Sequence, residues 1–333
     1  MSTTPPKRSR ILGTGHYLPE RVLTNFDLEK MVDTSDEWIN SRTGIRERHV
    51  AAEGEATSDM AIAAAKGALE MAGITAKDLD LIVVATISPD MQMPSTAMFV
   101  QRAIGARSDC PGFDIAAACA GFVYNMGIAD AFIRTGQAKY VLIVGAEMIT
   151  RYVDWNDRNT CVLFGDGAGA AVIGPSEDDK RGILSTHLYA DGGQAESLWI
   201  PGGGTKYPMT HEVIDQNLHR VKMVGKDVFK FAVKAMSAAA ETALEANGMT
   251  ADDVDWLIPH QANMRIIEGV VQRTGVPIER CIVNIDKTAN TSSASVGIAL
   301  DQAVRAGKIK PGQSVLFAAL GGGIAWGSAL VRW

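Results

Sequence analysis

The sequence predicts an α/β protein made of two related halves. Apolar runs of strand length alternate with alanine-rich segments of helical length throughout the 333 residues, a pattern typical of sheets covered by helices. A helix–turn–strand unit also occurs twice: Leu69 matches Leu244 and Asp80 matches Asp255, both 175 residues apart. The chain is long enough for two units with a core each.

A second repeated run strengthens the prediction of duplication. The letters VQR at 100–102 recur at 271–273, and Cys110 recurs as Cys281, both with an offset of 171 residues. The same offset relates Cys119 to Asn290. Two matching runs in the same order favour duplication over a chance match between alanine-rich helices. If the halves pack about a pseudo-twofold axis, Cys119 and Asn290 can face each other across it.

In the first half, the sequence predicts strands at 9–18, 80–86, 112–116 and 139–145, two strands within 160–173 around a turn at 164–167, and helices at 35–42, 57–72, 95–104 and 119–134. Ser35 or Thr34 is a suitable N-cap for the first of these helices, and Gly73 is a suitable C-cap for the second. The run at 80–86 is almost continuously apolar, as in strands buried on both faces of a parallel sheet.

In the second half, the same reasoning predicts strands at 182–190, 255–258, 281–285, 314–320 and 325–332, and helices at 226–247, 262–274 and 293–306. Gly248 marks the end of the long helix. The alternation of strands and helices predicts mostly parallel sheets.

Composition excludes several classes of function. The formal net charge is −6, which gives no global reason to expect a nucleic-acid partner. Four cysteines at 110, 119, 161 and 281 form no CxxC pair, which argues against a structural zinc site and a disulfide framework. No signal peptide is recognisable, and no apolar run approaches the roughly 20 residues of a membrane helix. We therefore expect a cytoplasmic protein with reduced thiols, no metal and no membrane partner.

Cys119 has the sequence context of a nucleophile. It follows a short apolar run and precedes a predicted helix, where unpaired backbone N–H groups and the helix dipole favour negative charge. That environment is expected to lower the pKa of the thiol and make the thiolate available for attack. The alternative is that Cys119 is a small buried hydrophobic residue, as most free cysteines are.

His260 follows the predicted strand at 255–258, at the carboxyl edge where ligand sites of α/β sheets lie. With the repeat, this position makes a cysteine, a histidine and an asparagine neighbours by topology. The alternatives are a hydrogen-bonded structural histidine and, for Asn290, a turn residue in a loop rich in serine and threonine.

Four runs carry a resemblance to a known family: AAACAGF at 116–122, PHQAN at 259–263, NTS at 290–292 and GGGIAWG at 321–327. They resemble β-ketoacyl-acyl-carrier-protein synthase III, the initiating condensing enzyme of type II fatty acid synthesis. Generic thiolases would show a second catalytic cysteine and elongating condensing enzymes a second histidine, so Asn290 places the chain in the Cys-His-Asn class.

The resemblance implies the thiolase fold, with two duplicated α/β halves related by a pseudo-twofold axis in five layers, α-β-α-β-α. Residues 1–180 would form the half with the nucleophilic cysteine, and residues 181–333 the half with the histidine and asparagine. The resemblance also implies a homodimer.

The resemblance implies a decarboxylative condensation without a metal or a resident cofactor. Cys119 would take the acyl group of an acyl-CoA primer, and the backbone N–H groups of Cys119 and Gly322 would stabilise the oxyanion. Malonyl-acyl carrier protein would then lose CO₂, and His260 and Asn290 would donate hydrogen bonds to the enolate. The products would be a 3-oxoacyl-acyl carrier protein, CO₂ and CoA.

The resemblance also assigns residues at the entrance. Trp38 and Arg158 would stack on the adenine of CoA, Arg42 would bind a phosphate, and Gly225 matches a tunnel position. Lys226 stands where the family is expected to have an asparagine, so no CoA contact is carried to it.

Further expected contacts concern the two protein partners. An acidic carrier protein requires basic residues, and Arg265 fits best, with Lys230 and Arg273 as weaker candidates. Met93 stands where the family often has an aromatic residue that reaches the acyl pocket of the partner subunit. Because methionine fills irregular space, we expect a primer pocket that accepts more than acetyl groups.

Two alternatives remain at this level. The first is a related starter synthase of secondary metabolism that uses another acyl donor or acceptor. The catalytic trio of Cys119, His260 and Asn290 alone does not distinguish such an enzyme from one of fatty acid synthesis. The second is a non-catalytic thiolase-fold protein that binds acyl-CoA or a partner. Loss of one trio residue would indicate the second alternative, and all three are present.

Overall fold

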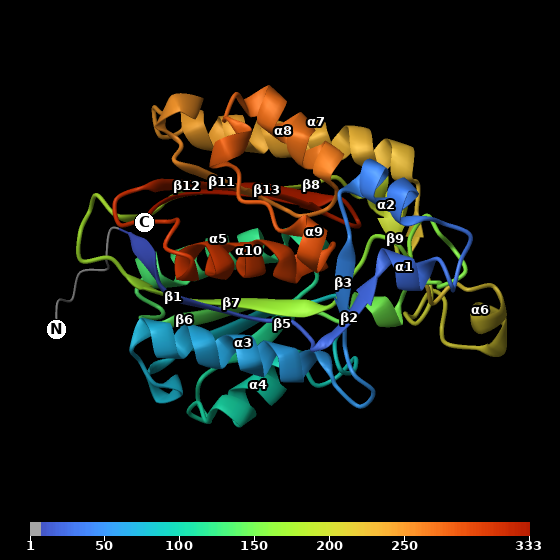
Figure 1. Cartoon of the computed structure of the whole chain (residues 1–333). Helices are drawn as coiled ribbons and strands as arrows, with labels where there is room; N and C mark the ends of the chain where they lie inside the picture. The colour runs from blue at the N-terminus through green and yellow to red at the C-terminus, as the bar shows by residue number, and fades with distance from the viewer. Residues whose placement is uncertain (1–7) are drawn as a thin grey trace.

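Two large β-sheets and three layers of helices form the body of the structure, a computed structural model that describes residues 8–333 (Figure 1). The layers follow each other as helices, sheet, helices, sheet, helices, which confirms the predicted five-layered thiolase fold. The helices of the three layers are α3 (Thr57–Ala72) with α4 (Thr96–Ile104), α5 (Gly121–Arg134) with α10 (Ser295–Arg305), and α7 (Gly225–Glu245) with α8 (Met264–Thr274). The first seven residues of the predicted first half lie outside the described residues.

The two sheets have matching strand orders. The first has the order β1-β7-β6-β4-β5 and the second β8-β13-β12-β11, and an isolated bridge between Leu257 and Cys281 takes the place of β5. The strands of the first sheet are β1 (Ser9–Tyr17), β4 (Leu81–Ala85), β5 (Gly112–Ile115), β6 (Val141–Glu147) and β7 (Gly167–Pro175). Those of the second are β8 (Gly182–Ala190), β11 (Trp256–Pro259), β12 (Ser314–Gly321) and β13 (Ala325–Arg332). The predicted division at residues 180 and 181 falls between β7 and β8.

The sheets are mixed, so the prediction of mostly parallel sheets was wrong. Only the pairs β4–β5, β4–β6 and β11–β12 are parallel, whereas β1–β7, β6–β7, β12–β13 and β8–β13 are antiparallel. Parallel neighbours require a crossover, usually helical. The chain returns from β12 to β13 through a short turn at residues 322–324 instead, so these strands run in opposite directions.

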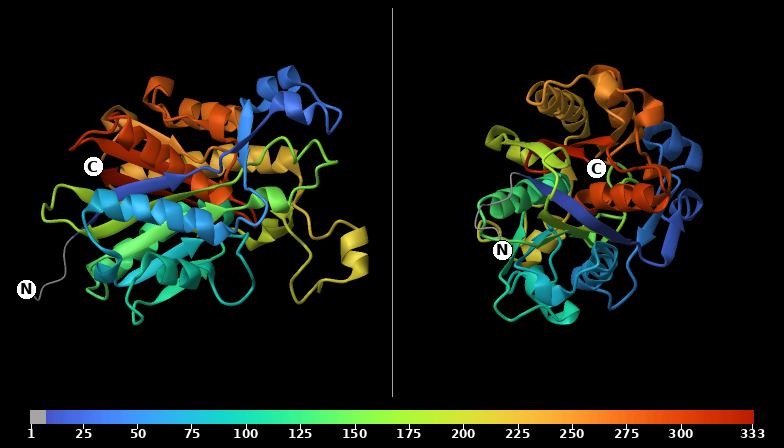
Figure 2. Two further views of the ribbon diagram at one scale, coloured as in Figure 1. Left: turned by 60° about the horizontal axis from the view of Figure 1, so that its bottom comes forward. Right: turned by 90° about the vertical axis from the view of Figure 1, so that its left-hand side faces the viewer.

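The remaining elements lie at one end of the layered body. They are β2 (Arg21–Thr24), α1 (Asn25–Leu28), α2 (Asp36–Thr43), β3 (Glu47–Val50), β9 (Leu198–Trp199), α6 (His211–Asp215), β10 (Lys222–Met223) and α9 (Ile285–Thr288). The segment that carries α6 projects from the layers, as Figure 2 shows. No helix within residues 8–333 is long and apolar enough to cross a membrane. The cytoplasmic location stays a prediction.

Two predicted strands are absent from the described chain. Within 160–173 only β7 forms, and Phe164 makes no more than an isolated bridge with Asn290. At 281–285 the backbone forms only the isolated bridge between Cys281 and Leu257, and beyond it the backbone bonds to a side chain: Gln261 donates to the carbonyl of Ile282 at 3.2 Å and accepts from the N–H of Asn284 at 3.1 Å. These contacts with Gln261 end the extended segment before α9 begins.

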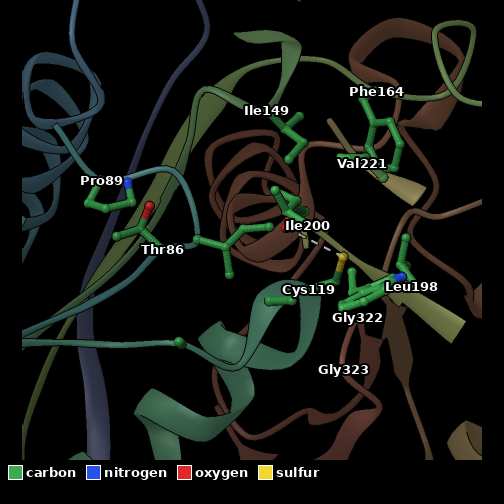
Figure 3. A pocket seen from close by; sticks show the side chains of 15 residues that line it. Thr86, Pro89, Cys119, Ile149, Phe164, Leu198, Ile200, Val221, Gly322 and Gly323 are labelled. Atoms are coloured by element: carbon green, nitrogen blue, oxygen red, sulfur yellow. Dashed lines mark hydrogen bonds between the residues drawn. The ribbon is translucent and has the colours of Figure 1, made fainter. Parts of the chain in front are cut away.

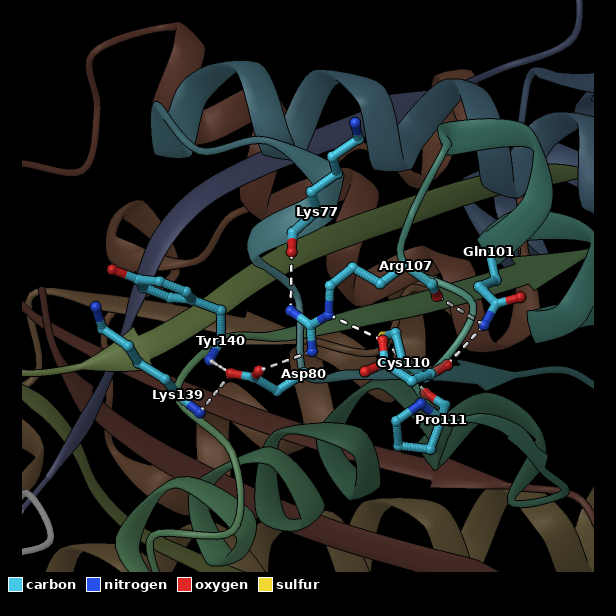
Figure 4. A network of polar contacts seen from close by, with 9 residues as sticks. Lys77, Asp80, Gln101, Arg107, Cys110, Pro111, Lys139 and Tyr140 are labelled. Carbon is cyan, nitrogen blue, oxygen red and sulfur yellow. Dashed lines mark hydrogen bonds and ion pairs between the residues drawn. The ribbon is translucent and has the colours of Figure 1, made fainter.

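A network of hydrogen bonds joins the residues at the start of β4 to those just before β6 (Figure 4). The carboxylate of Asp80 accepts from the backbone N–H groups of Lys139 and Tyr140 at 2.8 and 3.1 Å. The guanidinium of Arg107 donates to the carbonyl of Lys77 at 2.8 Å. These contacts fix the connection before β4 and the start of β6.

The second half repeats part of this network. Asp255, the counterpart of Asp80, accepts from the backbone N–H of Ser314 at 2.8 Å at the start of β12. Arg280 donates to the carbonyl of Asp252 at 3.1 Å, in the manner of Arg107. The duplication predicted from the sequence therefore extends to individual hydrogen bonds.

Candidate active site

Cys119 lies in the single turn Ala118–Ala120 that leads directly into α5. This confirms its predicted position at a helix start. Ala118 has a φ of +43°, a conformation that non-glycine residues rarely adopt and that the surroundings must impose. The end of β12 supplies those surroundings: a Cβ added at Gly321 would lie 2.6 Å from the backbone nitrogen of Cys119. The cysteine is 5% exposed.

The pKa of Cys119 is raised to about 12, mainly because burial disfavours the thiolate. The expectation of a lowered pKa was therefore wrong. The backbone N–H groups of Cys119, at the helix start, and of Gly322 do favour the thiolate, but they do not outweigh burial. The resting nucleophile is a protonated thiol, so its proton must be removed during attack.

His260 follows β11 directly, at the carboxyl end of the strand as predicted. Its backbone N–H donates to Ala318 at 2.8 Å, and its Nδ1 lies 2.6 Å from the hydroxyl of Ser295, the first residue of α10. Nε2 is therefore the ring nitrogen that is left to act on a ligand. Burial lowers the pKa of His260 to about 3, so the imidazole is neutral.

Asn290 is held by backbone contacts on both sides. Its N–H donates to Leu163 at 2.9 Å, and its carbonyl accepts from Gly165 at 3.0 Å. Its side-chain oxygen accepts from the backbone N–H of Ser292 at 2.8 Å. Because the oxygen is occupied, the amide NH₂ is the free end of this side chain.

Two cavities meet at Cys119. The narrower one, of about 110 Å³, is lined by Cys119, His260 and Asn290 together, and Gly225 is also part of its lining. The larger one, of about 450 Å³, is mostly apolar. Figure 3 shows its lining, which includes Thr86, Pro89, Ile149, Phe164, Leu198, Ile200 and Val221 around Cys119. The structure thus brings the predicted trio to one cavity and adds an apolar chamber beside it.

The predicted oxyanion donor Gly322 follows β12 and lines the larger cavity. A Cβ at this position would lie 2.8 Å from the carbonyl oxygen of Leu198, so only glycine lets the two backbones approach this closely. Its N–H is close enough to Cys119 to favour the thiolate. The same N–H can favour an oxyanion that forms on a carbonyl bound to the sulfur.

The structure also brings together the predicted coenzyme residues. The guanidinium carbons of Arg42 and Arg158 lie 4.6 and 5.0 Å from the ring centroid of Trp38. Ser35 caps the helix that carries Trp38, as predicted. Arg158 is further anchored by a 2.9 Å hydrogen bond to the carbonyl of Asp33.

The predicted carrier-protein residues are exposed but do not form one cluster. Arg265 lies in the first turn of α8 and donates to the carbonyl of Ser41 at 3.0 Å, which brings it beside α2. Arg273 lies in the last turn, about 12 Å further along the helix. Lys230 is on α7. Met93 is 85% exposed and lines neither cavity within this chain.

Sequence reasoning missed three residues that contact the trio or its partners. Ser292 accepts a hydrogen bond from the thiol of Cys119 at 3.4 Å, Glu147 accepts one from Ser292, and Ser295 engages His260. Ser292 stands in the run NTS, which was the one available signal. Within residues 8–333 no group of three or more His, Cys, Asp or Glu residues could hold a metal ion.

Comparisons with known proteins find relatives over nearly the whole chain. The family model described as 3-oxoacyl-[acyl-carrier-protein] synthase III matches residues 113–192, and its C-terminal counterpart matches residues 244–333. The chain is 53% identical to the beta-ketoacyl-[acyl-carrier-protein] synthase III of Xanthomonas campestris pv. campestris, over 98% of each chain.

Solved structures give the same result. The 3-oxoacyl-[acyl-carrier-protein] synthase III of Aquifex aeolicus superposes with a TM-score of 0.91 at 47% identity, over 98% of this chain and 100% of that one. The priming β-ketosynthase of the R1128 polyketide pathway has a TM-score of 0.91 at 37% identity, over 100% and 98%. The chain therefore belongs to the β-ketoacyl-[acyl-carrier-protein] synthase III family.

Proposed function

We propose that the protein transfers the acyl group of an acyl-CoA primer to Cys119 and condenses it with malonyl-acyl carrier protein, which initiates fatty acid biosynthesis. The observation that carries this proposal is the position of Cys119 between the apolar cavity and the cavity lined by His260 and Asn290. One sulfur can thus hold an acyl chain on one side while a second reactant is activated on the other. The products are a 3-oxoacyl-acyl carrier protein, CO₂ and CoA.

In the first half-reaction, the sulfur of Cys119 attacks the thioester carbon of the primer, and CoA leaves as a thiolate. The carbonyl oxygen carries negative charge in between. We assign the backbone N–H groups of Cys119 and Gly322 as its donors, because both already favour negative charge on the sulfur. A fixed donor of this kind commonly stabilises the transition state by about 3 kcal/mol.

In the second half-reaction, the malonyl group loses CO₂ and becomes an enolate. Its oxygen needs donors, and His260 can supply Nε2–H when the Ser295 hydroxyl donates to Nδ1. Asn290 can supply its amide N–H, since its oxygen is occupied by Ser292. The carbanion then attacks the acyl carbon, and the sulfur of Cys119 leaves. These steps need neither a metal nor a resident cofactor, because two neutral donors can hold the oxygen.

The residues expected at the entrance suit the two thioester substrates. The indole of Trp38 with the guanidinium planes of Arg42 and Arg158 offers stacking surfaces for adenine and positive charge for phosphates. Gly225, which lines the narrower cavity, leaves room for the pantetheine arm. For the acidic carrier protein we favour Arg265, beside the same entrance, over Lys230 and Arg273.

The apolar cavity supports a primer larger than acetyl. Its volume of about 450 Å³ equals that of roughly 15 water molecules in the liquid, and Ile87, Ile200 and Val221 are among the apolar residues of its wall. We propose a homodimer in which the exposed Met93 reaches the partner subunit, where a flexible side chain would accommodate primers of different shape.

A second candidate function is the priming step of a secondary metabolic pathway. The likeness to the priming β-ketosynthase of the R1128 polyketide pathway favours it. Both functions share the chemistry at Cys119, and they differ in the primer accepted and in the carrier protein that receives the product.

The experiment that tests the proposal is a reconstituted condensation. The protein is incubated with malonyl-acyl carrier protein and one acyl-CoA per reaction: acetyl-, butyryl- or isobutyryl-CoA. The mass of the carrier protein is then measured by mass spectrometry. A 3-oxoacyl product that contains the primer supports the proposal, and preference for the longer primers supports the larger pocket. Carrier protein that never gains the primer in any reaction would refute the proposed function.

A further inference from the structure

A chain of buried polar side chains leads away from the sulfur of Cys119. The thiol donates to the oxygen of Ser292 at 3.4 Å, and the Ser292 hydroxyl donates to Oε1 of Glu147 at 3.1 Å. Cys119 is 5% exposed, Ser292 1% and Glu147 is fully buried. Because a hydroxyl has a single proton, its donation to Glu147 leaves the lone pairs of Ser292 to accept the thiol proton.

Glu147 ends β6, and its second oxygen is held in place by the segment after β4. Oε2 accepts from the hydroxyl of Ser88 at 2.6 Å, from the N–H of Ile87 at 3.1 Å and from the hydroxyl of Thr86 at 3.3 Å. The carboxylate is therefore fixed on one side, while Oε1 is directed toward Ser292 and the nucleophile.

No cation compensates this carboxylate within the described part of the chain, where neither a hydrogen bond nor an ion pair joins it to a lysine, arginine or histidine. The titratable groups that its charge affects are Cys119 and Tyr152, whose pKa values it raises. Burial raises the pKa of Glu147 itself. An uncompensated buried carboxyl group costs stability, and such groups cluster at functional sites.

Ser292 is held in a constrained conformation. Its φ is +51°, which is unfavourable for a serine and persists only where the surroundings impose it. Its N–H donates to the side chain of Asn290 at 2.8 Å, so the backbone of Ser292 contacts Asn290 while its hydroxyl contacts Cys119. The strain is stored where the hydroxyl must lie between Cys119 and Glu147.

We propose that Ser292 and Glu147 form a proton relay that activates Cys119 for acylation, with Ser292 as a catalytic residue and Glu147 as a positioning residue that acts through it. The inference rests on the proposed function. As the sulfur–carbon bond forms, the S–H bond breaks and its proton moves to the oxygen of Ser292. The original proton of Ser292 moves to Oε1 of Glu147, which becomes a carboxylic acid.

The rest of the cycle restores the relay. CoA leaves with the electron pair of the broken thioester bond and takes a proton from water. After condensation, Cys119 leaves the acyl carbon as a thiolate, and Glu147 returns its proton through Ser292. One proton from solvent is consumed per turnover. The overall reaction requires it, because the malonyl carboxylate leaves as neutral CO₂ and its negative charge must be neutralised.

His260 is the other candidate base for the thiol, and its contacts argue against that role. Its Nδ1 is engaged by Ser295, and burial lowers its pKa to about 3. Within residues 8–333 no hydrogen bond joins it to Cys119, whereas Ser292 is in contact with the sulfur.

The test compares the two half-reactions across pH. The rate of acylation by butyryl-CoA is measured by rapid quench and intact mass between pH 6 and 9 for the parent, Glu147→Gln and Ser292→Ala. We expect both variants to lose about 10²-fold at pH 7. Their rates should rise about tenfold per pH unit, because direct ionisation of the thiol replaces the relay. Decarboxylation of malonyl-acyl carrier protein should change far less.

Three matched variants control for structural damage. Ser292→Thr keeps the hydroxyl and is expected to restore most of the acylation rate. Ser328→Ala removes a buried hydrogen bond to Ala239 at 2.6 Å, and Asp130→Asn removes the charge of a buried carboxylate that accepts from Ser9 at 2.8 Å. They should leave the pH profile of acylation unchanged.

Alkylation by iodoacetamide, followed at Cys119 by peptide mapping, needs no substrate and separates the two claims. If Glu147→Gln is alkylated more slowly, and its alkylation rate rises about tenfold per pH unit, the relay is supported. This holds even if the protein accepts no acyl-CoA, in which case only the proposed function is refuted. Parent-like rates and pH profiles in both variants would overturn the relay. Equal losses in both half-reactions together with a lower Tm would also overturn it, because they indicate a structural role.

Discussion

Ala118 and Ala289 occupy equivalent positions in the two halves, 171 residues apart, and both have a positive φ, of 43° and 54°. Each directly precedes a member of the trio, Cys119 in the first half and Asn290 in the second. The duplicated fold therefore places an unfavourable positive φ directly before two residues that line one cavity. We interpret this strain as the means by which the two side chains are directed toward each other.

Replacement of Ala289 by glycine is expected to stabilise the protein. Its φ of 54° with a ψ of −160° belongs to a region that is essentially restricted to glycine. Ala289→Gly should raise the free energy of unfolding by about 1 kcal/mol in urea denaturation. Ala238→Gly, at an exposed position in α7, should lower it by about as much. The explanation fails if both glycine variants destabilise the protein equally.

Removal of the Asn290 amide should affect one half-reaction. Because its oxygen is held by Ser292, the NH₂ group is the end available to an enolate. Asn290→Ala is expected to slow decarboxylation of malonyl-acyl carrier protein by about 10²-fold and to slow acylation of Cys119 much less. Separate assays of the two steps measure this. Equal losses in both would refute the division of labour.

Removal of the Trp38 ring should weaken binding of the coenzyme without changing the chemistry. Two guanidinium groups lie within 5.0 Å of its centroid. Trp38→Ala is expected to raise KM for acyl-CoA about tenfold at unchanged kcat, which corresponds to about 1.4 kcal/mol. An acyl-pantetheine substrate, which lacks the nucleotide, serves as control and should show no change in KM. A similar rise for both substrates would contradict the stacking role.

The neutral state of His260 should make stability fall in acid. Its pKa is about 3 in the folded protein and about 6.5 when exposed. As pH falls below about 6.5, the unfolded chain binds a proton that the native chain does not, so the native state loses stability. Between pH 7.5 and 5 the loss from this residue is about 2 kcal/mol. His260→Gln should show a correspondingly flatter dependence in urea denaturation, and parallel curves would contradict the assignment.

Much of this fold could be predicted because the sequence signals that specify it lie within single elements or occur in both halves. The alanine-rich run and Gly73 predicted the helix at 57–72, and the repeat predicted the two halves and the pairing of Cys119 with Asn290. The segment at 281–285 was mistaken for a full strand because, beyond the bridge at Cys281, its partner is the side chain of Gln261, a contact that no periodicity reveals.

The site was predicted less completely than the fold. Ser292 lies 173 residues from Cys119, and Glu147 lies 145 residues from Ser292, so only the tertiary structure brings them together. The raised pKa of Cys119 has the same origin, because sequence shows the helix start that favours a thiolate but not the degree of burial that opposes it. Residue identities therefore predicted the chemistry, whereas protonation states required the packing.

The most direct test of the central claim is the mass of the intact protein after incubation with acyl-CoA alone. We expect one acyl group per chain, mapped to Cys119 and discharged when malonyl-acyl carrier protein is added. Cys119→Ala, which retains Cys110, Cys161 and Cys281, should gain no mass. An acyl group that still appears in this variant, or an adduct on Cys119 that malonyl-acyl carrier protein does not remove, would contradict an acyl-Cys119 intermediate.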